Sequence, residues 1–509
     1  MKSYAKIFAL LLALLTLAMC FTSCGGGSET ETDPKGEQTT DTETTATETE
    51  DPRQAVKDDI PADLTFANEA NNTVTFFIRD DNEWWKHEID VDEITDDSLW
   101  DAVYRRNQTV EARLGVTITT IGQPGTFGPH TQWFQTLRNA VNTKSGDYDA
   151  ASIYISQGAP LAVEGMYYNL LDFPHISPEK PWWNQTIREE TTIFDTLFFL
   201  AGDIALSAIA GGDAMFFNKA LLERLYNNDV DLYEMVSNGE WTIDEMYSLV
   251  EGAWEDTNSS GIIDDGDTVG FLGTADQAGN PHKDAWIPAL GLTVTVMEEG
   301  YPVLALYNER SISAFEKTVD LYVNNPGTLG GTTTQTSFAS GNALFIMGTL
   351  KYGNSLRDMS DPYGVVPLPK YDADQENYGT TTSNGESMIA ILASLPEERT
   401  AMVGATLELM SAESYRQVTP VFYDVMLKSK FSDDPRDAEM YDLILQSFVY
   451  SFGFIYSTQS ISGIGSLFRS QTIDFAQKYE ANAQQYETAL ELLVDKLDEL
   501  SYNLLYGGN

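Results

Sequence analysis

In the first third of the chain, segments with one hydrophobic pattern alternate with segments that have another, and this succession predicts strands separated by helices. Short apolar runs are typical of buried strands, whereas apolar residues at spacings of three and four are typical of amphipathic helices. Strands alternating with helices favour an α/β fold with a mostly parallel sheet. The predicted elements are strands at Asn72–Ile78, Val116–Thr119 and Tyr148–Tyr154, and helices at Ser98–Leu114 and Gln132–Val141.

The rest of the chain continues this pattern and ends in helices. A helix beginning at Trp241 carries a Ser/Thr-x-x-Glu capping box, formed by Thr242 and Glu245. Further strands are predicted at Thr196–Ala201, Ala214–Phe217, Ala343–Met347, Tyr363–Val366 and Gly385–Leu392, with a helix at Pro396–Met410. The last hundred residues read as helical, and their apolar stripe favours core packing over a coiled-coil seam. That stripe consists of Tyr479, Tyr486, Leu490, Leu493, Leu497, Leu500 and Leu504.

The N-terminus has the composition of a targeting segment followed by a tether. Two lysines precede an apolar run at Ile7–Met19, which is short for a membrane span and typical of a signal peptide. Phe21–Cys24, followed by three glycines, resembles a bacterial lipoprotein box. The resemblance implies a signal peptide over 1–23 and lipidation of Cys24, with Cys20 as the poorer alternative and an ordinary secreted protein as the other reading. Residues 24–62 are rich in Thr, Glu and Asp, which predicts a disordered acidic tether.

Composition excludes several classes of function. The formal net charge of −47 argues against a nucleic-acid partner and against anionic membrane surfaces. Both cysteines lie in the first 24 residues, so the folded part has no disulfide and no thiolate site. The four histidines are scattered singly, which makes a zinc enzyme a poor expectation. No nucleophile elbow or phosphate-binding loop is present, although counting acids leaves a glycoside hydrolase open.

One acidic loop has the rhythm of a calcium-binding loop. Six residues occupy positions 1, 3, 5, 7, 9 and 12 of the EF-hand scheme, with Gly261 at the sharp turn. Position 12 is Asp rather than the bidentate Glu, so a weak, structural calcium site is expected, and an Asx-rich surface turn is the alternative. The expected ligands are Asp256, Asn258, Ser260, the carbonyl of Ile262, Asp264 and Asp267.

Several segments together resemble the extracellular solute-binding proteins of ABC importers, in the large family whose members often bind sugars. The likeness covers the chain from about residue 66 to its end. Besides Cys24 with its tether, it is carried by Lys180–Asn184, Gly202–Asp203, Phe216–Lys219, Gly239–Asp244, Gly270–Phe271, Phe338–Asn342, Tyr363–Pro369 and Phe422–Lys428.

The resemblance implies two α/β lobes joined by crossing strands, the type II periplasmic-binding-protein-like fold, which closes over ligand in the cleft between the lobes. Lobe 1 would span 66–207 and about 387–430, lobe 2 would span 208–386, and 431–509 would be a helical region packing on both. Gly202–Phe217 and Asn384–Ile389 would hold the hinge crossings, where glycines absorb backbone changes. The likeness departs at Met347–Tyr352, where maltodextrin-binding relatives carry a tryptophan and this chain has none unless Tyr352 replaces it. A maltodextrin ligand is therefore not expected, but a sugar is.

Sugar recognition needs aromatic faces for the C–H patches of the ring and planar polar groups for its hydroxyls. Because ligands bind beyond the carboxyl ends of strands, the polar and aromatic residues there are the candidates. For any one tryptophan, core packing is the competing interpretation. The predicted ligand-binding residues are Arg79, Asp80, Trp84, Trp85, Gln157, Trp182, Trp183, Asp213, Asp276, Trp286, Tyr352 and Glu386. The paired tryptophans rank highest, because two adjacent residues are not easily both buried.

The function expected from the sequence is reversible capture of a small ligand, a sugar or oligosaccharide, and its delivery to an ABC transporter permease. The protein would be monomeric, extracytoplasmic and held at the bacterial membrane by its lipid anchor alone, with no catalysis. A glycan-degrading or glycan-tethering surface lipoprotein without a transport role is the alternative.

Overall fold

The structure is a computed structural model, and it describes residues 51–126, 128–273, 283–330, 338–383, 385–427, 434–456, 467–468 and 474–507. The predicted signal peptide, Cys24, most of the tether and Asp276 lie outside these residues. The elements described below all belong to the compact unit Pro52–Asn509.

Four strands form the first sheet, in the order β11-β3-β1-β2. Strand β1 runs parallel to both β2 and β3, whereas β11 returns from much later in the chain and pairs antiparallel with β3. The bounds are Thr73–Arg79 for β1, Thr117–Gln123 for β2, Ala150–Tyr154 for β3 and Ser387–Ile391 for β11.

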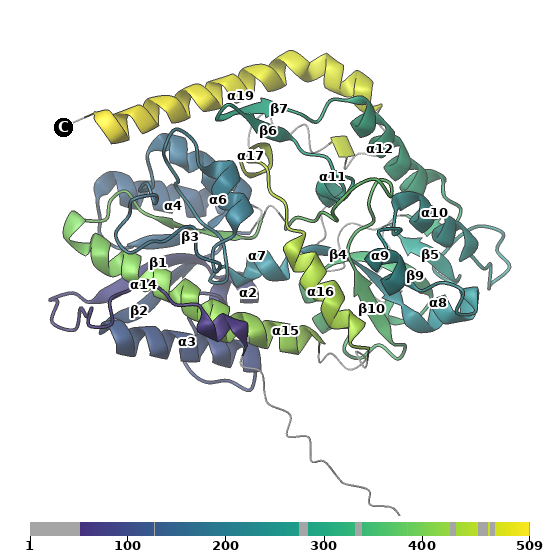
Figure 1. The fold of residues 1–509 in the computed structure, drawn as a ribbon, viewed down its shortest axis with the longest axis horizontal. Helices are drawn as coiled ribbons and strands as arrows, with labels where there is room; N and C mark the ends of the chain where they lie inside the picture. Colours follow the sequence, from purple (N-terminus) through teal and green to yellow (C-terminus); the bar gives the residue numbers. More distant parts are fainter. Residues whose placement is uncertain are drawn as a thin grey trace, which may run out of the picture. The chain divides into compact units, whose positions relative to one another are not determined.

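The strands of this sheet lie between α4 (His130–Thr143) and α3 (Ser98–Leu114) in Figure 1, and alternating side chains of β1 are buried on its two faces. Phe77 stacks on Trp133 of α4, with ring centroids 4.4 Å apart. Phe76 and Ile78 point the other way, into a core shared with α3 and α14 (Thr400–Glu413). The remaining elements of this half, called lobe 1, are α2 (Glu83–His87), α5 (Ile155–Gly158), η2 (Ala159–Glu164), α6 (Gln185–Thr191), η6 (Glu397–Arg399), η7 (Ser414–Val418) and α15 (Thr419–Leu427).

The second sheet has five strands in the order β10-β4-β9-β5-β8, and its half of the structure is called lobe 2. Its strands are β4 (Asp213–Asn218), β5 (Val269–Leu272), β8 (Thr328–Leu329), β9 (Ala343–Thr349) and β10 (Tyr363–Val366). Strand β4 is antiparallel to both of its neighbours, β9 and β10, while β5 is parallel to β8 and β9.

Helices and a small two-stranded sheet complete lobe 2. The capping residue predicted for α10 is confirmed, because the Thr242 hydroxyl accepts a hydrogen bond from the Glu245 N–H at 3.3 Å. These elements are α8 (Lys219–Tyr226), α9 (Leu232–Ser237), α10 (Ile243–Gly252), η3 (Lys283–Ala285), α11 (Trp286–Ala289), β6 (Thr295–Glu298), β7 (Tyr301–Leu304), α12 (Glu309–Val319), η4 (Asp320–Asn324), η5 (Leu350–Leu356) and α16 (Arg436–Gln446).

The chain crosses between the lobes through α7 (Leu206–Ala210) and two glycines, and returns through Thr380–Thr382. Gly212 forms a β-bridge with Thr382, so the outgoing and returning segments lie side by side. A Cβ on Gly211 would come within 2.7 Å of the Glu386 side chain, and one on Gly212 within 2.3 Å of the Phe448 ring. Only glycine fits such close approaches. The predicted two-lobed α/β fold is confirmed.

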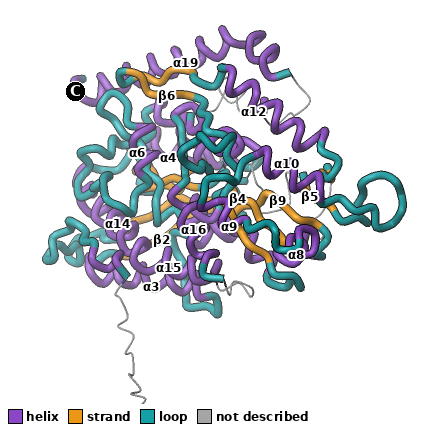
Figure 2. The backbone as a smooth tube through the Cα atoms, turned by 45° about the vertical axis from the view of Figure 1, so that its right-hand side comes forward, coloured by secondary structure: helices purple, strands orange, loops and turns teal. Residues whose placement is uncertain are grey.

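The long C-terminal helix α19 (Phe475–Tyr506) contacts η2 of lobe 1 and α12 of lobe 2. It runs past β6 in both views (Figures 1 and 2), and the short helix α17 (Phe452–Ile455) packs on β6 and β7. The predicted stripe packs as core along most of this helix, with Leu497 fully buried. At its end Leu504 is 50 % exposed, because the helix runs beyond the surface that it covers.

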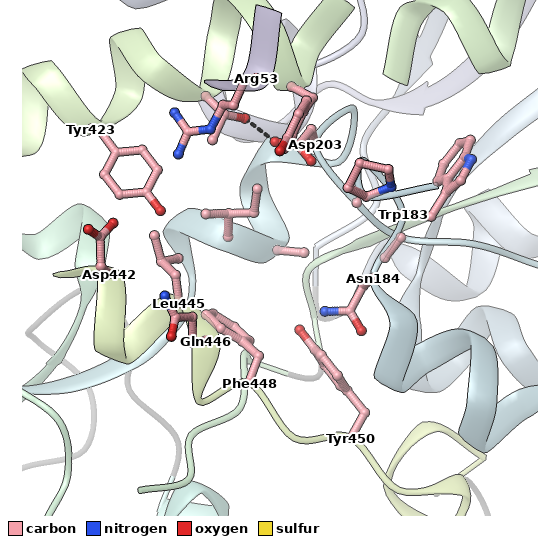
Figure 3. A pocket seen from close by; sticks show the side chains of 17 residues that line it. Arg53, Trp183, Asn184, Asp203, Tyr423, Asp442, Leu445, Gln446, Phe448 and Tyr450 are labelled. Atoms are coloured by element: carbon pink, nitrogen blue, oxygen red, sulfur yellow. Dashed lines mark hydrogen bonds between the residues drawn. The ribbon is translucent and has the colours of Figure 1, made fainter. Parts of the chain in front are cut away.

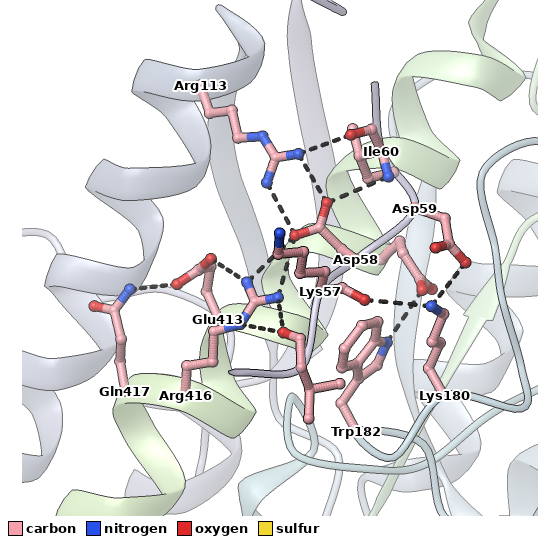
Figure 4. A network of polar contacts seen from close by, with 12 residues as sticks. Lys57, Asp58, Asp59, Ile60, Arg113, Lys180, Trp182, Glu413, Arg416 and Gln417 are labelled. Carbon is pink, nitrogen blue, oxygen red and sulfur yellow. Dashed lines mark hydrogen bonds and ion pairs between the residues drawn. The ribbon is translucent and has the colours of Figure 1, made fainter. Parts of the chain in front are cut away.

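Residues 52–62, predicted as part of the tether, are packed on lobe 1, and that prediction is wrong (Figure 4). A short 3-10 helix, η1 (Pro52–Ala55), leads to Asp58, whose carboxylate pairs with Arg113 at 2.7 Å and Arg416 at 3.2 Å. Ile60 is buried beside them. The acidic composition misled the prediction because the balancing arginines come from α3 and η7, far along the chain.

The predicted strand at Thr196–Ala201 is wrong, because the segment makes only isolated bridges, including one from Leu200 to Ile389. Among the described residues, no helix is both long and apolar enough to cross a membrane.

Candidate functional site

One cluster of polar and aromatic side chains lies where the ends of strands from the two sheets face each other. In lobe 1, β1 ends at Arg79, β3 ends at Tyr154 and β11 begins at Ser387, all at the same edge. Lys351 comes from lobe 2, at the start of η5, which follows β9. Such an edge is where ligands bind in α/β folds. The lobe-edge cluster is defined as Arg79, Trp85, Tyr154, Lys351, Glu386 and Ser387.

Arg79 is the buried centre of this cluster. Its guanidinium donates to the carbonyl of Gly385 at 2.5 Å and to the Ser387 hydroxyl at 2.7 Å. The same guanidinium lies 3.9 Å from the ring centroid of Trp85 and 5.3 Å from that of Tyr154. These contacts fix the start of β11 to the end of β1 and hold two aromatic rings in place.

Glu386 connects the two lobes. One carboxylate oxygen accepts the indole N–H of Trp85 at 2.9 Å, and the other accepts Lys351 at 2.7 Å. Trp85 stands on α2, which Asn82 caps by accepting a hydrogen bond from the N–H of Trp84. The ion pair is largely buried, with 13 % of Lys351 and 4 % of Glu386 side chain exposed. A carboxylate held between cation and indole is a planar acceptor suited to ligand hydroxyls.

A second carboxyl group, Glu88, lies buried behind the cluster. It accepts hydrogen bonds from the Ser152 hydroxyl and from the Ser207 N–H of α7, each at 3.0 Å. Burial raises the pKa of Glu88, and the hydrogen bonds and Arg79 oppose that rise. Burial likewise raises the pKa of Tyr154. Glu88 therefore ties lobe 1 to the crossing helix, and Tyr154 stays a neutral phenol.

Three predicted ligand-binding residues come together here, namely Arg79, Trp85 and Glu386. Gln157 is half-buried on α5, and Asp80 is exposed, with its side chain against Gly122. Asp213 is buried at the start of β4, where its backbone pairs with the returning crossing segment. Asp276 lies outside the described residues.

The prediction that two adjacent tryptophans are not easily both buried is wrong for Trp182 and Trp183. Both are buried, because Glu408 of α14 accepts one indole N–H on each carboxylate oxygen, at 3.1 and 3.0 Å. The partner that satisfies both indoles lies more than 220 residues along the chain. These tryptophans pack within lobe 1, and only the edge of Trp183 reaches a cavity.

Three other predicted aromatic residues pack in the core or against it. Trp84 is half-buried and packs edge-on against Trp100 and Phe422, whereas the next residue, Trp85, contacts the lobe-edge cluster. Trp286 is buried in lobe 2 and donates to the Tyr322 hydroxyl at 3.0 Å. Tyr352 is buried too, against Phe216, Phe338 and Tyr363. For these residues the core interpretation is correct.

Sequence reasoning missed Lys351, Tyr154, Ser387 and Glu88. Lys351 directly precedes the predicted Tyr352, so the position was found but the wrong neighbour was chosen. Tyr154 ends a correctly predicted strand, which is the usual place of a ligand-facing residue. For Ser387 and Glu88 the sequence holds no local signal, because their partners come from distant segments.

A separate cavity of about 350 Å³ lies beside the crossing segments (Figure 3). Its wall includes Trp183, Asn184, Asp203, Tyr423, Phe448 and Tyr450. None of the described residues that line it belongs to the lobe-edge cluster. Asp203 accepts a hydrogen bond from the Thr419 hydroxyl at 2.5 Å, and burial raises its pKa to about 7.

The predicted calcium loop is closed by a bridge between Glu255 and Thr268. Asp256 accepts the backbone N–H groups of Ser260 and Gly261, at 3.0 and 2.9 Å, which is a tight turn around the predicted first ligand. Asp267 is buried and accepts hydrogen bonds from Thr257, Asp264 and the Trp254 indole. No group of three metal-type side chains converges anywhere in the described ranges. Calcium binding stays a prediction.

No protein-family model matches the chain, and no curated protein matches it in sequence. Among solved structures, UgpB from Mycobacterium tuberculosis in complex with glycerophosphocholine matches with TM-score 0.52 and 11 % identity, covering 84 % of this chain and 99 % of that one. A cyclo/maltodextrin-binding protein in complex with maltotetraose matches with TM-score 0.51 and 11 % identity, covering 86 % and 98 %.

An ABC substrate-binding protein from Listeria monocytogenes, in complex with cycloalternan, matches with TM-score 0.49 and 11 % identity, covering 86 % and 100 %. The fold assignment rests on the two matches above 0.5. They show that the chain has the two-lobed fold of such solute-binding proteins, and the resemblance seen in the sequence is confirmed at the level of the fold.

Proposed function

We propose that this protein captures a small hydroxyl-rich ligand, a sugar or oligosaccharide, reversibly between its two lobes. Binding needs no covalent step, and the lobe-edge cluster supplies what recognition requires. Trp85 and Tyr154 provide aromatic surface, Glu386 provides a planar acceptor, and Lys351 provides a donor. The complex of one structural neighbour with maltotetraose supports a ligand of this kind.

One observation carries this proposal. Glu386 stands beside the lobe 1 strand β11 and pairs with Lys351, which follows the lobe 2 strand β9. A ligand that contacts this place touches both lobes at once. Because it then has more contacts when the lobes are closed, binding shifts the population toward the closed arrangement.

The proposal extends to transport and location. The ligand would be handed to the permease of an ABC importer by a monomeric protein on the outer face of the bacterial membrane. Lipidation of Cys24 and the acidic tether that follows it would hold the protein there. The support is the lipoprotein-like sequence at Phe21–Cys24 and the packed segment from Pro52, which leaves a tether of about 27 residues. Metabolic labelling with a radioactive fatty acid in wild type and Cys24→Ala tests the anchor.

Titration with a panel of monosaccharides and oligosaccharides tests the capture of ligand. Melting temperature and small-angle scattering are recorded together. A ligand at 100 times its Kd stabilises the folded state by about 2.7 kcal/mol, so a true ligand raises the melting temperature measurably. The same ligand should reduce the radius of gyration. If the ligand is released chemically unchanged, the protein is a binding protein. If an oligosaccharide is converted to a shorter one, the proposal is contradicted.

A matched pair of variants tests the site. Lys351→Met removes the cation that bridges to Glu386, whereas Lys86→Met removes an exposed lysine from α2 without a described partner in the cluster. The loss of a hydrogen bond to a charged group costs about 1.5–3 kcal/mol, so Lys351→Met should weaken binding by roughly 10- to 150-fold. Lys86→Met should leave affinity unchanged. Equal affinities in the two variants would place the ligand elsewhere.

We also propose that the loop Asp256–Asp267 binds calcium weakly, in the range of about 10⁻⁴–10⁻³ M, and stabilises lobe 2. The support is the six matching positions and the turn in which Asp256 accepts two backbone N–H groups. Millimolar CaCl₂ should raise the melting temperature of the wild type and of Asp265→Ala, which lies outside the scheme. Asp256→Ala should abolish that rise. An identical calcium response in all three proteins would leave the loop a metal-free surface turn.

A further inference from the structure

The cavity beside the crossing segments has walls from both lobes. Tyr423 belongs to α15, which packs on α3 of lobe 1. Asp442 and Gln446 belong to α16, which packs on β10 of lobe 2 and is tied there by the ion pair of Asp437 with Lys219 at 2.9 Å. Ala208 and Ile209 of the crossing helix α7 also line it. A molecule in this cavity therefore contacts lobe 1, lobe 2 and the crossing at once.

Its size and lining differ from those of a packing defect. Protein interiors hold few voids larger than a water molecule, whereas small-molecule sites start at about 300 Å³. At about 350 Å³ this cavity accommodates a molecule the size of a monosaccharide. An empty apolar void would be lined by aliphatic side chains, but here carboxyl, amide and hydroxyl groups line much of the wall.

The lining groups suit a neutral, hydroxyl-rich molecule. Figure 3 shows the Asn184 amide and the hydroxyls of Tyr423 and Tyr450 directed toward the open space. Asn184 caps α6 through its side-chain oxygen, which accepts the Ile187 N–H at 2.8 Å, so its NH₂ group remains as a donor. Phe448 and Tyr450 stack with centroids 6.1 Å apart and form an aromatic wall.

Charges of both signs stand around this space, so neither an anion nor a cation is favoured. The Arg53 guanidinium lies over the Tyr423 ring at 5.0 Å and the Tyr415 ring at 5.7 Å, which places a cation on one side. Asp203, which lies beside Arg53, and Asp442 supply carboxyl groups to the same wall (Figure 3). Aromatic faces together with planar acceptors and donors are the chemistry that recognises sugar rings.

We propose that this cavity is a second binding site, for a monosaccharide-sized polyol, separate from the lobe-edge cluster. Because its walls come from both lobes, occupancy of the cavity depends on the angle between the lobes. Ligand binding at the two sites is therefore thermodynamically linked, each changing the affinity of the other by the same factor.

Cavity-filling variants test this proposal with five monosaccharides as probes: glucose, galactose, mannose, xylose and arabinose. Gln446→Trp places a large ring at the cavity rim, and Glu439→Trp places the same ring on an exposed face of the same helix. Saturation-transfer NMR and calorimetry measure binding in the background Trp85→Ala/Lys351→Met, in which the lobe-edge cluster is disrupted. We expect one monosaccharide to bind this background with 1:1 stoichiometry, at least tenfold more weakly with Gln446→Trp, and unchanged with Glu439→Trp.

The outcomes separate this proposal from the proposed function. If no probe binds the disrupted background, or if Gln446→Trp leaves binding unchanged, the cavity is not a polyol site, and capture at the lobe-edge cluster is unaffected. Asp442→Ala provides a second variant should Gln446→Trp fail to fold, with the expected result a loss of affinity. In the otherwise wild-type chain, Gln446→Trp should remove one class of site while binding sensitive to Lys351→Met persists.

Discussion

Replacing Glu408 by glutamine isolates one buried carboxyl group that titrates near neutral pH. Glu408 is fully buried on α14, and its two oxygens accept the indole N–H groups of Trp182 and Trp183 and the backbone N–H of Ser177. Burial raises the pKa of Glu408 from 4.5 to about 7, while the hydrogen bonds from the tryptophans and Ser177 limit the rise.

The size of the effect follows from this shift. A carboxyl group whose pKa is higher in the folded state holds its proton more tightly there than in the unfolded chain. Its contribution to stability is complete below pH 4.5 and is lost as the pH rises through about 7. A pKa raised from 4.5 to about 7 corresponds to a loss of roughly 3 kcal/mol in the free energy of unfolding between these two pH values.

Glutamine keeps the shape of Glu408 but neither titrates nor accepts through its NH₂ group. One indole N–H therefore loses its acceptor, which costs about 1–3 kcal/mol at every pH. Near pH 5 the variant should be less stable than the wild type by that amount. At pH 8 the wild type has lost its roughly 3 kcal/mol and the variant has not, so the two should be similar or the order reversed.

Urea unfolding followed by tryptophan fluorescence at pH 5, 6, 7 and 8 measures the difference between the two proteins. Glu413→Gln provides the control, since Glu413 lies on the same helix but pairs with Arg416 at 2.6 Å. That control should keep the pH dependence of the wild type. A difference between wild type and Glu408→Gln that stays constant from pH 5 to pH 8 would refute the assignment of a raised pKa to Glu408.

Three other substitutions have expected costs that follow from local contacts, and urea unfolding measures each. Thr242→Ala removes the side-chain cap of α10 and should cost about 1 kcal/mol, while Thr242→Ser should restore most of it. Asp58→Ala leaves Arg113 and Arg416 without their shared carboxylate and should lower the free energy of unfolding by about 2–4 kcal/mol. This loss is smaller than for a fully buried ion pair, because the Arg113 side chain is 29 % exposed. An unchanged midpoint would mean that the N-terminal segment only rests on lobe 1. Leu497→Ala on the buried face of α19 should cost about 2–5 kcal/mol, whereas Leu504→Ala, half-exposed on the same helix, should cost little.

The candidate site was only partly accessible to sequence reasoning. Arg79 and Trp85 follow a strand that could be recognised, and ligands gather at strand ends, so that rule found them. The same rule also selected Trp84, which is one position away on a single helical turn and points into the core. Sequence patterns locate the end of an element, but the direction of each side chain there depends on what packs around it.

By itself the sequence determined the elements whose signals are local. The helix Ser98–Leu114 has both the predicted bounds, because Asp97 caps its start and Gly115 ends it in a left-handed conformation at φ 68°. Strands β1, β3, β4, β9 and β11 follow from short apolar runs, since burial on two faces leaves no polar alternation. Such signals act over about four residues and can be read without knowing the fold.

Only the tertiary structure decided which residues meet at the candidate site and which are buried. Trp182 and Trp183 are buried because of Glu408, and Lys351 reaches the lobe-edge cluster because Glu386 stands across the crossing. The segment 52–62 is ordered because arginines from α3 and η7 balance Asp58. In each case a polar group can be buried only with a partner, and the partner comes from a distant part of the chain. That pairing exists only once the two lobes have folded.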